Sequence, residues 1–184
     1  MSPRLRTAGR DDAERIVLLH ADSWRRNYRG VYADSFLDGD VVTDRLSVWT
    51  SRLAAPADSL TFVAEDEAAL LGFVHVIFDK DVRWGSLIDN LHVAHGLRRT
   101  GVGSLLLTRA AEAVAEHAAG KSIYLWVQEQ NAAAQQFYRA MGGISSEKGP
   151  ISPPGGVSSR LSGTHYMFRF TWSDTSSVTR TNDH

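Results

Sequence analysis

Residues 98–104, Arg-Arg-Thr-Gly-Val-Gly-Ser, join an apolar strand to a helix rich in alanine and leucine. Because glycine has no Cβ, the backbone at Gly101 and Gly103 can come close to an anion. The first turn of the following helix carries N–H groups without intrahelical partners, and these can donate to phosphate oxygens. Such a turn alone is more often plain strand-to-helix packing, so its interpretation as a phosphate site depends on the flanking sequence.

The segment before this glycine loop, 87–93, is predicted to be a strand. Its apolar residues Ile88, Leu91 and Val93 do not keep a strict two-residue alternation, and a β-bulge near Asn90 would reconcile them. A bulge there would splay the strand from its neighbour. It would leave backbone groups available to a ligand just upstream of the loop.

Hydrophobic periodicity elsewhere predicts alternating helices and strands. The expected strands are 3–7, 60–64, 70–78, 122–127 and 164–172, and the expected helices begin near 11 and 43 or span 102–117 and 131–141. The two strands 60–64 and 70–78 should form an antiparallel hairpin through an acidic turn. Residues 149–156 are rich in proline and glycine and are expected to be a long loop, either functional or disordered.

Composition limits the function classes. The 184 residues are 43% hydrophobic, which fits one domain over 1–172, followed by a polar flexible tail over 173–184. With 20 basic and 21 acidic residues there is no basic surplus for nucleic acid or an anionic membrane. The absence of cysteine excludes disulfides and thiolate chemistry. Residues 1–10 lack an apolar signal core, so a cytoplasmic protein is expected.

Two motifs together resemble the signatures of the GCN5-related N-acetyltransferase (GNAT) family, over residues 86–143. The first signature, Arg/Gln-x-x-Gly-x-Gly/Ala, is matched by Arg98, Gly101 and Gly103. The second, Asn-x-x-Ala-x-x-Phe-Tyr-x-x-x-Gly, is matched by Asn131, Ala134, Phe137, Tyr138 and Gly142. The segment 24–30, Trp-Arg-Arg-Asn-Tyr-Arg-Gly, is also similar to the first-helix segment of a bacterial subgroup of these enzymes.

The resemblance implies an α/β (α+β) GNAT fold. Its central mixed, mostly antiparallel twisted sheet would have six to seven strands, a V-shaped split and about four flanking helices. It also implies acetyl-CoA as cosubstrate, without a metal. The residues expected to bind it are Leu91, His92, Val93, Arg98, Arg99, Thr100, Gly101, Val102, Gly103, Ser104, Asn131 and Tyr138.

The implied chemistry is direct attack of an amine on the thioester, without an acyl-enzyme. The resemblance places the phenol of Tyr138 near the coenzyme's sulfur, where it can protonate the thiolate; a core role for this residue is the alternative. Asn131 has an alternative role as a helix N-cap. Asp89 and His92 are the candidate bases, with His75 a weaker third and a water relay also open. Asp89 could instead hold the substrate's cation.

The acceptor is expected to contact Trp24, Tyr28, Tyr32 and Asp89. The leading hypothesis is N-acetylation of a small-molecule amine, a metabolite or an aminated antibiotic, which would make antibiotic resistance a possible role. Acetylation of a protein N-terminus or lysine is an alternative, as is a non-catalytic acyl-CoA-binding sensor. Nucleoside triphosphate binding is disfavoured because the loop lacks a Gly-Lys-Ser/Thr ending. Dimers are frequent in the family, so a homodimer is also open.

Overall fold

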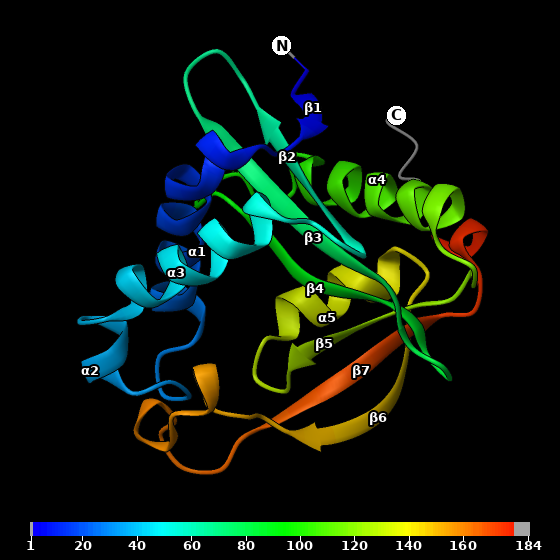
Figure 1. Cartoon of the computed structure of the whole chain (residues 1–184). Coiled ribbons are helices and arrows are strands. Elements are labelled where there is room, and N and C mark those ends of the chain that lie inside the picture. Colours follow the sequence, from blue (N-terminus) through cyan, green and yellow to red (C-terminus); the bar gives the residue numbers. More distant parts are fainter. Residues whose placement is uncertain (1, 179–184) are drawn as a thin grey trace.

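A seven-stranded sheet with the order β1-β2-β3-β4-β5-β7-β6 forms the centre of the computed structural model, which describes residues 2–178 (Figure 1). β4 and β5 are parallel, and every other neighbouring pair is antiparallel. The mixed, mostly antiparallel sheet is therefore confirmed. The strands are β1 (Arg4–Thr7), β2 (Ser59–Glu65), β3 (Leu70–Asp81), β4 (Gly85–Val93), β5 (Ile123–Gln128), β6 (Ile144–Pro150) and β7 (Tyr166–Trp172).

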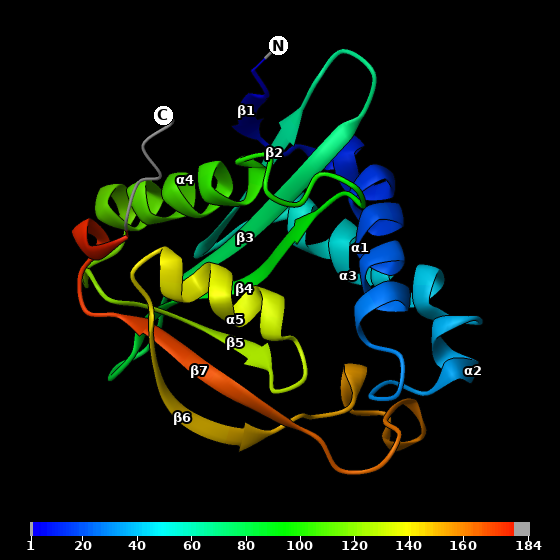
Figure 2. The same cartoon turned by 180° about the vertical axis from the view of Figure 1, so that it is seen from behind.

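Helices cover both faces of the sheet, as the two opposite views show (Figures 1 and 2). The α-helices are α1 (Ala13–Asn27), α2 (Asp34–Leu37), α3 (Val41–Ala54), α4 (Val102–His117) and α5 (Ala132–Ala140). Alternation along β3 separates the two cores. Phe73 packs with residues of α1 and α3, whereas Val74 and Val76 pack with residues of α4 and α5. The four-residue α2 adds one helix to the four that were expected.

The sheet splits between β4 and β5. These strands pair only at Ser86 with Ile123 and at Leu87 with Tyr124, near their first residues, and then diverge (Figure 1). On the other side of β4, His75 pairs with Asn90 and Val76 with Ile88, so Asp89 is an extra, unpaired residue. The bulge predicted near Asn90 is thus present at Asp89.

The region after α5 differs most from expectation. Residues 144–150 form the edge strand β6, which was not predicted. The expected loop 149–156 begins inside this strand and continues in a segment that packs against the chain after α1. Ile151 is buried there, and the Ser162 N–H donates to the Val31 carbonyl at 2.8 Å.

The packed chain also extends beyond the expected tail boundary at residue 173. A 3-10 turn, Thr175–Ser177, follows β7, and Val178 is only 7% exposed within the core that includes α4. The described part of the tail therefore does not match a loose segment, because Val178 buries its side chain. Residues 179–184 lie outside the described residues. No helix within 2–178 is long and apolar enough to cross a membrane.

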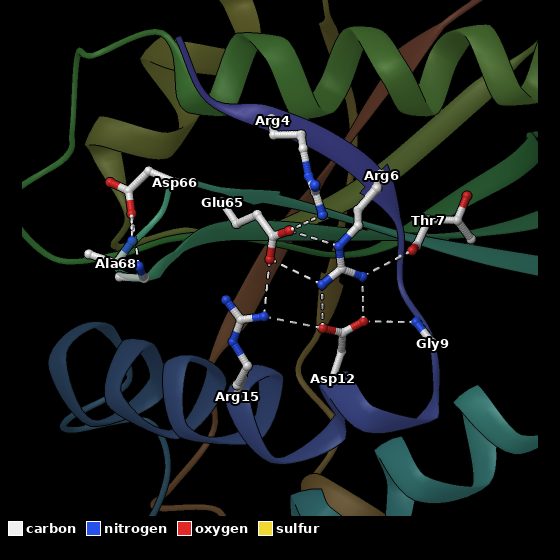
Figure 3. Close-up of polar contacts among 10 residues, drawn as sticks. Arg4, Arg6, Thr7, Gly9, Asp12, Arg15, Glu65, Asp66 and Ala68 are labelled. Carbon is white, nitrogen blue, oxygen red and sulfur yellow. Dashed lines mark hydrogen bonds and ion pairs between the residues drawn. The ribbon is translucent and has the colours of Figure 1, made fainter. Parts of the chain in front are cut away.

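A charged network fixes the start of α1, the helix that carries several candidate site residues (Figure 3). The guanidinium of Arg6 donates to both oxygens of Asp12 at 2.7 and 2.8 Å, and to both oxygens of Glu65 at 2.8 and 3.0 Å. Arg15 on α1 also donates to Glu65, at 3.0 Å. Since Glu65 ends β2 and Arg6 lies on β1, the network ties this edge of the sheet to the helix.

Candidate active site

The two glycines of the loop have different roles, and of these two only Gly101 has a backbone conformation that favours glycine. Gly101 is the N-cap of α4 with φ +87° and ψ −9°, and a Cβ placed on it would meet no atom within 4 Å. A Cβ on Gly103 would instead lie 3.3 Å from Cζ of Phe137 and 3.7 Å from Cγ2 of Val93. Gly101 therefore gives the turn and open space in front of it, and Gly103 lets α4 approach α5 and β4 closely.

Positive charge lies at the mouth of this loop. Arg98 reaches back to the last residue of α1, where its Nη2 donates to Oδ1 of Asn27 at 2.8 Å. Arg98 and Asn27 line an open hollow of about 590 Å³ together with Arg26, His95 and Gly96. Two arginines, Arg26 and Arg98, therefore line this hollow beside the loop that leads into α4.

Across the split, α5 presents Tyr138. Asn131 caps this helix, since its Oδ1 accepts from the Ala134 N–H at 3.2 Å, as its alternative role predicted. Tyr138 is 8% exposed, and its ring lies 5.9 Å from that of Phe170. Burial, with a smaller contribution from Tyr28, raises the pKa of Tyr138 above its usual range. The phenol therefore keeps its proton at neutral pH.

The bulge brings two consecutive residues of β4 to the same guanidinium. Arg52 on α3 donates to Oδ2 of Asp89 at 2.6 Å and to Oδ1 of Asn90 at 2.8 Å. In a regular strand these neighbours would point to opposite faces. Asp89 is therefore a paired carboxylate, about 30% exposed, on the side of the sheet that α3 covers.

His92 lies on the same side, against α1. Its Nδ1 is 2.7 Å from Oγ of Ser23, and its ring centroid is 4.6 Å from that of His20. Burial lowers the pKa of His92 to about 4, although the Asp89 carboxylate opposes this shift. His75 is 2% exposed and its Nδ1 is bonded to the hydroxyl of Thr61 at 2.8 Å, a structural environment within the sheet.

The aromatic residues expected to bind the acceptor form one cluster. The ring of Tyr32 lies 5.0 Å from that of Trp24 and 4.6 Å from that of Tyr28. Burial, with a smaller contribution from Asp89, raises the pKa of Tyr28 to about 12. Tyr28, which follows the last residue of α1, also contributes to the raised pKa of Tyr138 on α5.

The acidic residues near α2 are already paired in part. Arg29 donates to Asp34 at 3.0 Å and to Asp38 at 2.5 Å, both on the surface. Exposed ion pairs of this kind contribute little to stability.

Comparison with known proteins places this arrangement in a family. The sequence profile of the acetyltransferase (GNAT) family matches residues 15–142. The chain belongs to this family. As a GNAT protein it is an acetyltransferase, which agrees with the resemblance of its two motifs.

Relatives and solved structures support the assignment. The uncharacterized N-acetyltransferase YuaI of Bacillus subtilis is 28% identical over 139 residues, which cover 74% of this chain and 77% of YuaI. The PaiA N-acetyltransferase of Thermoplasma acidophilum, solved in complex with coenzyme A, matches with TM-score 0.70 and 18% identity over 92% of this chain and 98% of that chain. The yncA protein of Salmonella typhimurium, solved with its cofactor acetyl-CoA, matches with TM-score 0.67 and 15% identity over 94% of each chain.

Three residues near the candidate site of this GNAT protein have partners that the sequence did not predict: Ser23, Arg52 and His20. His20 is buried on α1 and Ser23 lies about one turn further along the helix, and a sequence pattern does not show which partners such polar residues take. Arg52 reaches β4 from α3, a contact between residues 37 positions apart. Within residues 2–178, no group of three or more acidic or histidine side chains is arranged to hold a metal ion.

Proposed function

We propose that this acetyltransferase transfers the acetyl group of acetyl-CoA to a primary amine of a small molecule, by direct attack with both substrates bound. The observation that carries this is the split after Leu87 and Tyr124. Asp89 and His92 lie on β4 beyond this pairing, the glycine loop follows the end of β4, and Tyr138 lies on α5, which follows β5. This order supports one site that combines an anion-binding turn, a strand edge and proton-carrying groups.

The residues present fit acetyl-CoA. Its pyrophosphate suits the N–H groups of residues 99–104, and the open space before Gly101 leaves room for it. Residues 91–93 pair with β3 on one side. Their other edge faces β5. Among the described residues, β4 pairs with β5 at Ser86 and Leu87 only. A pantetheine arm can pair with that edge as an added strand would.

When bound, acetyl-CoA supplies a thioester carbonyl for attack. A backbone N–H from the edge of residues 91–93 donates to the carbonyl oxygen as negative charge develops there. Tyr138 keeps its proton on Oη because its pKa is raised, so it can donate to the sulfur as the C–S bond breaks. Asn131 caps the first turn of α5, the helix that carries Tyr138.

The acceptor amine approaches from the side of α1 and α3. Trp24 and Tyr32 are 6% and 8% exposed and belong to a packed cluster, so the aromatic residues leave no open groove between them. This supports a small molecule over a protein chain, which would need an open groove. Asp89 attracts the ammonium form, and Asp89, His92 or an intervening water takes the proton that must leave before attack.

The test combines purified protein, acetyl-CoA and a free-thiol readout with a panel of amines, peptides and aminated antibiotics. Release of thiol that depends on a small amine supports the proposal. Turnover on peptides alone would replace it with the protein-acetylating alternative. Tight coenzyme binding without any turnover across the panel would favour the sensor.

A further inference from the structure

A chain of hydrogen bonds with a fixed direction runs from the glycine loop to His92. A guanidinium has donors and no acceptor, so the oxygen of the Asn27 amide must face Arg98, with Nη2 to Oδ1 at 2.8 Å. The amide nitrogen of Asn27 therefore faces Ser23. It donates to the Ser23 carbonyl at 2.9 Å and to the Ser23 hydroxyl oxygen at 3.3 Å.

The hydroxyl of Ser23 continues this direction. Its oxygen accepts from Asn27 and lies 2.7 Å from Nδ1 of His92. Among the residues that the structure describes, the hydroxyl hydrogen of Ser23 has no other acceptor besides Nδ1 of His92. This favours donation from Ser23 to Nδ1 over the reverse direction, in which the oxygen would accept twice. Since a neutral imidazole carries one hydrogen, His92 carries it on Nε2.

The surroundings keep His92 neutral. Its neighbour His20 accepts at Nδ1 from the indole N–H of Trp49 at 3.0 Å, so His20 also carries its hydrogen on Nε2. The charged groups facing this pair are Arg45 and Arg52 on α3 and Asp89 on β4, which is itself paired with Arg52. Burial disfavours a cationic His92 and lowers its pKa to about 4, although the Asp89 carboxylate opposes this shift.

We propose that His92 donates a hydrogen bond from Nε2 to the acceptor and is not the base. Ser23 and Asn27 hold His92 in this tautomer. The inference rests on the proposed function, which sets where the acceptor binds. Nε2 of His20 is buried without a partner, whereas Nε2 of His92 is not among the buried unpartnered atoms of residues 2–178. A donor in this position fits an acceptor molecule with an oxygen atom near its amino group, which can accept the hydrogen bond. Examples are an amino alcohol, an amino sugar or an amino acid derivative. The proton of the ammonium then leaves to Asp89 or to water.

The tautomer can be measured without any substrate. Long-range proton–nitrogen NMR spectra of protein labelled with ¹⁵N-histidine distinguish Nε2–H from Nδ1–H, and His92→Gln assigns the signals. We expect Nε2–H on His92, with no titration across neutral pH. Ser23→Ala should give a mixture of tautomers, whereas the control Ser51→Ala, exposed on α3, should not. A hydrogen on Nδ1, or titration of His92 near its ordinary pKa, would overturn the inference.

Kinetics with an accepted amine give the second readout. Glutamine can donate from a similar position but cannot act as a base at neutral pH. His92→Ala should lose about tenfold in kcat/KM, mainly in KM, as expected for one lost hydrogen bond. His92→Gln should lose less than His92→Ala, because it restores a donor, and should keep the shape of the wild-type pH profile. Equal loss in both variants together with loss of the acidic limb would identify His92 as the base. Absence of turnover in the wild type would instead count against the proposed function, and the NMR result would still decide the tautomer.

Discussion

Replacing Gly101 by alanine tests the assignment of the glycine loop. At φ +87°, an L-residue at this position is strained by about 1–2 kcal/mol, although its Cβ would meet no atom within 4 Å. Gly30 is a matched control, with φ +83° and equally open space, at the turn after α1. In a protein of this size, each replacement should lower the Tm by about 2–8 °C.

The two variants should differ in coenzyme binding. The methyl group of Gly101→Ala would project into the space proposed for the pyrophosphate, so we expect coenzyme A to bind at least about tenfold more weakly, equivalent to about 1.4 kcal/mol. Gly30→Ala should bind it as the wild type does. Isothermal titration calorimetry with coenzyme A measures the affinities. Thermal unfolding without ligand measures the decrease in Tm that both variants share because of backbone strain. Affinity within about twofold of the wild type for Gly101→Ala would refute the phosphate assignment.

Three further outcomes follow from the structure. Tyr138→Phe should lower kcat by about 10²-fold or more and leave the calorimetric affinity for coenzyme A unchanged; an unchanged kcat would remove the phenol from the reaction. Asn131→Ala should lower stability by about 1 kcal/mol through loss of the α5 cap, while Asn131→Ser should restore most of it in denaturant unfolding. Hydrogen bonds from Arg6 hold the pKa of Glu65 at about 2, below its ordinary 4.5, so the stability from this carboxylate is present above about pH 4.5 and is lost as the pH falls toward 2. Glu65→Gln should therefore show a lower Tm at neutral pH and a shallower fall of Tm with acid; a parallel fall would contradict the role given to this network.

The features that could be predicted from the sequence are local ones. The helix over 102–117 has the bounds that its composition and the glycine turn predicted, because a cap and a helical period act within a few residues. The bulge beside Asn90 was also visible, since one extra residue shifts the apolar alternation of a strand. The two family motifs lie in these same segments, so the coenzyme side of the site could be located with them.

The features that could not be predicted depend on contacts between distant segments. All seven residues of β6 are exposed or half-exposed, so the strand has no apolar alternation to reveal it. Val178 lies in a run of serine and threonine, and only the neighbouring helix α4 explains its burial. On the acceptor side, each candidate's state depends on a partner from another element. Asp89 depends on Arg52, and His92 depends on Ser23.

The bulge has a second effect beyond splaying β4. By turning Asp89 and Asn90 toward the same face, it lets one guanidinium, that of Arg52, bind both. Asp89 thereby keeps a fixed orientation and is charge-balanced before any ammonium arrives. An amine that binds there must share this carboxylate with Arg52, so charge alone gives it modest affinity. Discrimination among amines must then come from the shape of the site beside the aromatic cluster and from the donor that we assign to His92. The groups next to the amine then matter more for selection than the amine itself.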